Sequence, residues 1–171
     1  QYKQNQNKEI KMDMDSILKQ IKQESREKAL SNGAYTGYQL ISKLKDVSDR
    51  NKPVIINMKL PAYDDNYEVI GYDYIYVASD FKCRSWRGSY DLPAAGFDSP
   101  DDATFLVKEI IKNIEESDRL EVTGWKGGDF TLSMNDVIYI ANQGESNESI
   151  AVVDIEELPD VVILHTEPDM Y

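Results

Sequence analysis

The sequence lacks several features that would place it in a well-defined class of protein. It contains one cysteine, Cys83, so no disulfide can form within the chain, and we expect a reducing compartment, most simply a cytoplasm. No apolar run approaches the ~20 residues that a membrane-spanning helix needs. The first residues are polar and lack the apolar core of a secretory leader, so we expect none. The composition therefore predicts a globular cytoplasmic protein with no membrane partner.

Basic residues are scarce and unevenly distributed. The 171 residues include 19 lysines and arginines against 31 aspartates and glutamates, a net charge of −12. Residues 1–34 carry seven basic and five acidic residues, a net of +2, which leaves −14 for residues 35–171. After Lys126 there is no lysine or arginine. Because such a surface repels the nucleic-acid backbone, we expect no direct nucleic-acid binding. An acidic surface usually serves solubility, but it can also mimic DNA and occupy a DNA-binding protein.

Catalytic and metal-binding patterns are also missing. His165 is the only histidine, and its position after an apolar run favours a structural role. A histidine metal site needs partner ligands, which Cys83 alone does not supply, so we expect no metal. The spacing of the serine, cysteine, histidine and aspartate residues supports neither a Ser-His-Asp triad nor a Cys-His dyad. There is neither a Walker loop nor a dinucleotide fingerprint. We therefore assign no catalytic residue and no cofactor, and we regard an enzyme as the less favoured class.

Helical periodicity appears in three places. Residues 1–14 are polar, and we expect them to be loose or stabilised by a partner. Residues 15–30 predict a helix capped by Asp15 or Ser16, and the Thr36 to Gln39 spacing of a capping box precedes a second helix. Ser99-Pro100 predicts the start of a third helix. Its apolar stripe consists of Leu106, Val107, Ile110, Ile111 and Ile114.

Strand-like runs fill most of the remainder. The tyrosine-rich run at 72–77 predicts a strand with aromatic side chains on one face, and Asp64-Asp65-Asn66 predicts the turn before it. The acidic run from Glu156 to Asp160 is interpreted as a solvated face. The other predicted strands are 53–58, 120–123, 130–132, 137–141, 150–153 and 161–164.

The order of these elements sets the expected fold. It predicts an α+β fold, with a mainly antiparallel sheet packed with two to three helices. We expect residues 1–34 to form an N-terminal extension with one helix, and residues 35–171 to form a single domain.

Two matching segments stand out against the acidic background. The only two tryptophans are each followed by a cation and a glycine, in Trp86-Arg87-Gly88 and Trp125-Lys126-Gly127. A tryptophan ring stacks on a base, worth ~1–3 kcal/mol, while arginine and lysine bind phosphate. Glycine lets the backbone N–H groups approach phosphate oxygens. The candidate ligand-binding residues are Arg84, Trp86, Arg87, Gly88, Tyr90, Trp125, Lys126, Gly127, Gly128 and Asp129, the last as a ribose partner.

A structural interpretation of these segments stays open. Trp-cation-Gly at a strand end is also compatible with a β-bulge that buries the tryptophan while the cation reaches solvent. For either copy alone that interpretation is favoured. The match between the copies, together with the concentration of cations in an acidic chain, favours a binding site.

The two segments belong to a wider pattern. Ser85-Trp86-Arg87-Gly88-Ser89-Tyr90 precedes Leu92-Pro93-Ala94 and a predicted helix, and Gly124-Trp125-Lys126-Gly127-Gly128-Asp129-Phe130 precedes a strand and Asn142-Gln143-Gly144. In this respect residues 36–166 resemble a widespread, poorly characterised family of small proteins encoded by tailed bacteriophages. The chain departs from that family in having tryptophan where tyrosine is usual, a long N-terminal extension, and an expanded region at 60–83. The resemblance implies a phage accessory protein in the bacterial cytoplasm and brings no settled mechanism.

These observations lead to three functional hypotheses. The leading one is a counter-defence protein that binds and sequesters a small nucleotide immune signal, either an ADP-ribose derivative or a cyclic nucleotide. We expect a homo-oligomer, because such pockets often lie between subunits. The alternatives are an acidic inhibitor or DNA mimic that binds a host defence protein, and an enzyme that degrades a nucleotide signal. The sequence leaves open the ligand, the oligomeric state, the role of residues 1–34, and whether the two motifs converge on one pocket.

Overall fold

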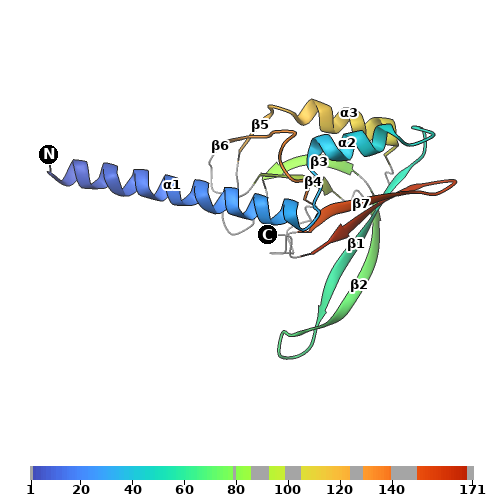
Figure 1. The fold of residues 1–171 in the computed structure, drawn as a ribbon, viewed down its shortest axis with the longest axis horizontal. Coiled ribbons are helices and arrows are strands. Elements are labelled where there is room, and N and C mark those ends of the chain that lie inside the picture. The colour runs from blue at the N-terminus through green and yellow to red at the C-terminus, as the bar shows by residue number, and fades with distance from the viewer. Residues whose placement is uncertain are drawn as a thin grey trace.

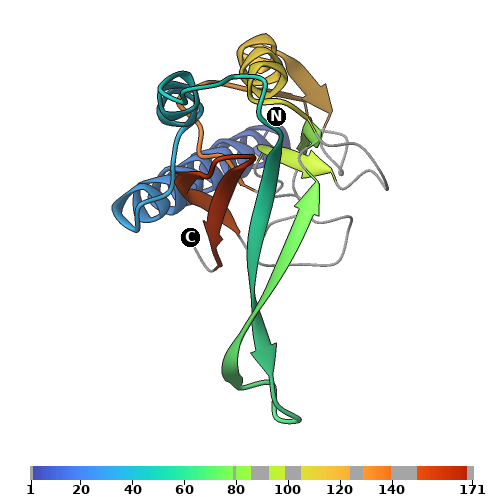
Figure 2. The same cartoon turned by 90° about the vertical axis from the view of Figure 1, so that its right-hand side faces the viewer.

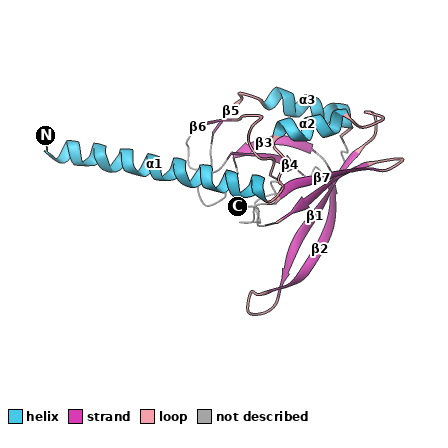
Figure 3. Cartoon of the chain, viewed as in Figure 1, coloured by secondary structure: helices cyan, strands magenta, loops and turns pink. Residues whose placement is uncertain are grey.

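A four-stranded sheet with helices on one face forms the centre of the molecule (Figure 1). The computed structural model describes residues 2–78, 80–85, 93–98, 105–123, 129–139 and 150–168. The helices are α1 (Tyr2–Ser31), α2 (Gly37–Lys45) and α3 (Val107–Ser117). The strands are β1 (Val54–Tyr63), β2 (Val69–Ala78), β3 (Asp80–Ser85), β4 (Pro93–Asp98), β5 (Glu121–Thr123), β6 (Asp129–Thr131), β7 (Ala151–Glu157) and β8 (Val162–Glu167), and Figure 3 distinguishes them from the helices by colour.

The sheet is mixed rather than purely antiparallel. Its strand order is β2-β1-β8-β7, and β3-β4 and β5-β6 form two separate antiparallel hairpins. β1 pairs antiparallel with β2 but parallel with β8, and β8 pairs antiparallel with β7. The predicted α+β class and the mainly antiparallel pairing are confirmed. The parallel pair was not predicted, because parallel strands are joined through a long crossover that leaves no local sequence signal.

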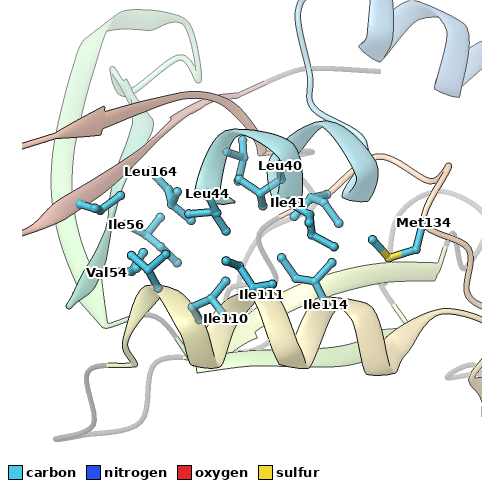
Figure 4. Close-up of a cluster of buried hydrophobic side chains, with 14 of the residues drawn as sticks. Leu40, Ile41, Leu44, Val54, Ile56, Ile110, Ile111, Ile114, Met134 and Leu164 are labelled. Atoms are coloured by element: carbon cyan, nitrogen blue, oxygen red, sulfur yellow. The ribbon is translucent and has the colours of Figure 1, made fainter. Parts of the chain in front are cut away.

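The hydrophobic core lies between this sheet and the pair α2 and α3 (Figure 4). Strand alternation places Val54, Ile56 and Met58 of β1 on the helix-facing side, where all three are buried. The α3 stripe meets them with residues spaced at i, i+3, i+4 and i+7. The fully or almost fully buried members of this stripe are Val107, Ile110, Ile111 and Ile114.

Two local signals were correctly interpreted from the sequence. At the start of α2, the Gln39 N–H donates to the Thr36 hydroxyl at 3.2 Å, and the Thr36 N–H donates to the Gln39 side chain at 2.9 Å. At the β1–β2 turn, one Asp64 carboxylate oxygen accepts from the N–H groups of Asn66 and Glu68 at 2.8 and 2.9 Å. Both motifs work over four or five residues, which is why sequence alone specifies them.

The third helix begins later than predicted. Leu106 has extended backbone angles and forms an isolated bridge with Pro53, so α3 starts at Val107. The Val107 N–H donates to the Lys52 carbonyl at 3.0 Å, and the Leu106 N–H donates to the Glu109 carboxylate at 2.7 Å. The predicted start at Ser99-Pro100 lies outside the described residues.

The N-terminal helix and one predicted strand also differ from expectation. Residues 2–14 are helical and continuous with the predicted helix, so neither Asp15 nor Ser16 caps it. Residues 137–139 make isolated bridges, Val137 to Thr36 and Tyr139 to Ala151, instead of a continuous strand. A second, smaller core forms here from Ala29, Ala34, Val137, Tyr139 and Ala151, and it fastens the end of α1 to the sheet. No helix among the described residues has the length and apolar character to cross a membrane.

Candidate functional site

The two tryptophan motifs occupy equivalent places in the chain topology. Residues 86–92 connect β3 to β4, and residues 124–128 connect β5 to β6. Backbone pairing continues up to both connections, at Ser85 with Pro93 and at Thr123 with Asp129. The predicted site residues within the connections lie outside the described residues: Trp86, Arg87, Gly88, Tyr90, Trp125, Lys126, Gly127 and Gly128.

Two predicted site residues lie on the strands that flank these connections. Arg84 is on β3 and pairs with Ala94 of β4. Asp129 is the first residue of β6 and pairs with Thr123 of β5. Each motif is therefore carried by the turn end of its own antiparallel hairpin.

The hairpins are neighbours, and both are tied to α3. Strand β3 contacts α3 and β5. Strand β5 follows α3 after Arg119, whose positive φ of 65° turns the chain, and the Arg119 N–H donates to the Leu132 carbonyl at 2.8 Å. The Asp118 carboxylate accepts from the Met134 N–H at 3.1 Å, and both Leu132 and Met134 are buried. The base of the second hairpin is thus fixed to the core, beside the strand that leads into the first motif.

A second group of polar and aromatic side chains lies on the sheet face opposite the core. Strand alternation places Asn57 and Lys59 of β1 on this face, and the pairing register adds His165 and Glu167 of β8. We call this surface the second face. Its other members in the register are Tyr72 and Tyr74 of β2, and Asp154 and Glu156 of β7.

His165 is the centre of a chain of hydrogen bonds across three strands. His165 Nε2 lies 2.8 Å from a Glu156 carboxylate oxygen, and Nδ1 lies 3.3 Å from the Asn57 amide nitrogen. With the proton on Nε2, the imidazole donates to Glu156 and accepts from Asn57. The buried Asn57 Oδ1 has no hydrogen-bond partner among the described residues. A buried unpaired carbonyl costs stability, so this arrangement holds polar groups in place at the expense of folding free energy.

Lys59 forms a second cross-strand group beside the first. Its ammonium lies 2.8 Å from the Glu167 carboxylate and 4.7 Å from the centre of the Tyr72 ring. The hydrogen bond to Glu167 raises the pKa of the Lys59 ammonium above its usual value. The lysine is therefore held as a cation, and its contact with the tyrosine ring is a cation–π interaction.

The acidic run from Glu156 to Asp160 is exposed, as the sequence predicted, and two of its carboxylates also make specific hydrogen bonds. Glu156 binds His165, and Glu157 accepts hydrogen bonds from the Ser48 N–H at 2.7 Å and the Ser48 hydroxyl at 2.9 Å. The Lys52 ammonium lies 3.4 Å from the Glu157 carboxylate. These donors, led by the backbone N–H of Ser48, lower the pKa of Glu157 below its usual value.

Sequence reasoning missed the second face because its partners are far apart in the chain. Asn57 and His165 are 108 residues apart. One signal was present: Asn57 and Lys59 interrupt an otherwise apolar strand at alternate positions, which indicates a polar surface on one side of β1.

Comparison with family models, curated proteins and solved structures finds no match. The site therefore has to be interpreted from its own chemistry. Among the described residues, no group of three or more His, Cys, Asp or Glu side chains is arranged to hold a metal ion. The second face combines tyrosine rings, an amide, an imidazole, an ammonium and carboxylates.

Proposed function

We propose that the chain binds and sequesters a small nucleotide through the paired tryptophan motifs. The observation that carries this proposal is the adjacency of the two hairpins: β3, which leads into the first motif, contacts β5, which leads into the second. Two short segments with the same aromatic-cation-glycine order then belong to neighbouring turns. That placement suits one ligand with an aromatic base and a phosphate.

Each residue type has a role in this proposal. Arg87 and Lys126 hold phosphate oxygens, Arg84 adds a third cation, and Trp86 and Trp125 stack on bases. Asp129 accepts hydrogen bonds from ribose hydroxyls. The glycines let backbone N–H groups approach the phosphate oxygens, and Tyr90 closes the pocket. Binding is favoured over catalysis because the motifs contain neither a general base nor a nucleophile with an activating partner.

The biological setting belongs to the same proposal. The resemblance to tailed-bacteriophage proteins, together with the single cysteine, supports a phage protein in the cytoplasm of its bacterial host. There the natural ligand is a nucleotide immune signal, either an ADP-ribose derivative or a cyclic nucleotide. Sequestration of such a signal requires tight binding without turnover.

Thermal unfolding in the presence of ADP-ribose, cyclic ADP-ribose and cyclic dinucleotides tests this function. A ligand at one hundred times its dissociation constant stabilises the folded state by about 2.7 kcal/mol, which raises the melting temperature by several degrees. The double variant Arg87→Ala/Lys126→Ala should lose this rise. The matched control is Lys108→Ala/Lys112→Ala, which removes two exposed cations from α3 and should keep it. A folded wild-type protein that none of these nucleotides stabilises contradicts the proposal.

Recovery of the ligand separates sequestration from degradation. Nucleotide incubated with the protein and released by heat should be chemically intact by chromatography. Conversion of the nucleotide to products would establish the enzyme alternative instead.

A further inference from the structure

Helix α1 extends from the rest of the molecule as a projecting rod (Figure 1). Its 30 residues correspond to a length of about 45 Å. Its contacts with the body are at the C-terminal end, where Ala29 is fully buried and the Arg26 guanidinium donates to the Asn135 carbonyl at 2.8 Å. Further out, Met14 and Ile17 are 54% and 51% exposed.

The described side chains in the outer part of α1 make only weak contacts within one copy. Gln20 donates to Glu24 at 3.0 Å and Gln23 donates to Glu27 at 3.1 Å, but pairs of this kind contribute only about 0.2–0.5 kcal/mol each. Most helical stability in proteins comes from packing an amphipathic face against another element. Met14 and Ile17, three residues apart, lie on one side of the helix and leave two apolar side chains exposed there.

The β1–β2 hairpin is the second projecting element, shown most clearly in Figure 2. We call residues 59–74 the arm. Tyr67 at its tip is 87% exposed, and Ile70 and Tyr74 on β2 are 69% and 59% exposed. Strand β2 forms an edge of the four-stranded sheet. Edge strands are usually protected by lysine or proline, and β2 contains neither.

The tyrosines give the arm an amphipathic face of its own. Tyr74 is opposite Lys59 and Tyr72 is opposite Pro61 in the antiparallel register, so both tyrosines lie on the second face. Ile70 lies at an irregularity in this register, where the pairing shifts between Ala62 and Tyr63, and is exposed there. Large rings with a polar edge are the side chains most enriched at protein interfaces.

Helix α1 and the arm are complementary in charge. The arm contains one lysine and four carboxylates, a net of −3. Helix α1 contains seven basic and five acidic residues, a net of +2, in a chain whose residues 35–171 carry −14. An α1–α1 contact would bring two positive surfaces together and an arm–arm contact two negative ones. A helix–arm contact joins opposite signs.

We propose that two copies of the chain form a two-fold dimer in which α1 of each copy lies along the arm of the other. In Figure 1 the helix and the arm leave the body in different directions. A two-fold axis that runs between the direction of α1 and the direction of the arm places α1 of each copy along the arm of the other. The two helix–arm contacts therefore form together, and the dimer is closed to further copies. Met14 and Ile17 then pack on Tyr72 and Tyr74. This dimer does not depend on the proposed nucleotide site.

Sedimentation equilibrium of the full chain tests whether α1 and the arm join two copies. The wild type should be a dimer, and Ile17→Asp or Tyr74→Ser should each raise the dimer dissociation constant about tenfold or more. The matched control is Tyr38→Ser, which removes a 55% exposed tyrosine from α2 and should leave that constant within about twofold. Because all three side chains are exposed, circular dichroism should show unchanged folding. A monomeric wild type at high micromolar concentration overturns the proposal, as does a dimer unaffected by both interface variants.

Cross-linking between copies that carry different single cysteines identifies which segment of the second copy lies against α1. Ile17→Cys and Tyr74→Cys are made separately in a Cys83→Ser background, mixed, and treated with a short flexible bis-maleimide. The proposal expects a covalent dimer in the mixture and none from either variant alone. A dimer from Ile17→Cys alone means that the helices pair with each other, and one from Tyr74→Cys alone means that the arms do. Either result overturns the helix–arm assignment.

Salt provides an independent check on the charge argument. Exposed charges are screened beyond about 10 Å at 0.1 M salt and beyond about 3 Å at 1 M. The dimer dissociation constant should therefore rise as sodium chloride increases across this range. A dimer that tightens with salt contradicts the pairing of opposite charges.

Discussion

At the scale of single residues, local partners were predictable and distant ones were not. The Thr36 capping box was predicted because its two hydrogen bonds span three residues. The exposure of Glu157 was predicted, but its hydrogen-bond partner was not, because Ser48 is 109 residues away. The contact of His165 with Asn57 across the parallel strand pair was missed likewise, because these residues are 108 positions apart. A single sequence specifies which residues are polar, but pairing across a sheet depends on a register that it does not encode locally.

Glu157 gives the stability of the fold a specific pH dependence. Its folded-state pKa is below the usual value of 4.5, so its ionised form stabilises the protein above that pH. This contribution is lost as the pH falls through the folded-state pKa. Between about pH 6 and about pH 3, the free energy of unfolding should therefore fall more steeply for the wild type than for Glu157→Gln.

Urea denaturation at a series of pH values measures this difference. Ser48→Ala keeps the backbone N–H, which is the main cause of the shift, and loses the hydroxyl. Its pH slope should lie between those of the wild type and Glu157→Gln. Parallel pH profiles for all three proteins would refute the role of Glu157.

At the scale of elements, hydrophobic periodicity identified helices and strands better than their ends. The stripe of α3 was correctly located, because residues spaced at three and four positions form one face of a helix. Its start was wrong, since Leu106 is held extended by its bridge to Pro53, the residue before β1. In the described part of the strand predicted at 137–141, Val137 and Tyr139 pair with two different segments instead, and residues 140–141 lie outside the described residues.

The α3 stripe should also dominate the stability of the main core. Ile110 has no exposed surface and belongs to the cluster that joins α2, α3, β1 and β8. Replacement of Ile110 by alanine removes buried methyl groups and leaves a cavity, so we expect a loss of about 2–5 kcal/mol in the free energy of unfolding. Guanidinium denaturation measures this loss. Lys112→Ala, two residues along on the exposed side, should change it by less than about 0.5 kcal/mol. Similar losses from the two variants would contradict the assigned core.

At the scale of the whole molecule, the fold class was predictable and the connections between parts were not. The order of helices and strands was enough for an α+β fold, because each element must bury its apolar face against another layer. The parallel pairing of β1 with β8 and the contact between β3 and β5 depend on tertiary packing. The sequence left open whether the two motifs converge on one pocket, and the structure adds that the strands β3 and β5, which lead into them, are in contact.

The described core clusters draw their members from Ala29 onward. Removal of residues 1–22 should therefore leave the remaining domain folded. The rest of α1, including Arg26 and Ala29, keeps its contacts with the body.

Differential scanning calorimetry compares the wild type with the chain that lacks residues 1–22. At low protein concentration, where the wild type is monomeric, the melting temperatures of the two proteins should agree within about 2 °C. At high concentration the wild type alone should gain stability, because association stabilises the folded state by mass action. Unfolding of the truncated chain would show that the outer part of α1 contributes to the monomer.

The parallel pairing of β1 with β8 has a consequence for the order in which the chain matures on the ribosome. Asn57 emerges 108 residues before His165, so β1 must wait for its neighbour until almost the whole chain has been synthesised. During that interval β1 can pair with β2, but its other edge stays open to unintended partners. Both tryptophan motifs are synthesised inside this interval, between the two strands that later join. The closing of the central sheet is thus a late, non-local event, and we expect the nascent chain to need protection until β8 arrives.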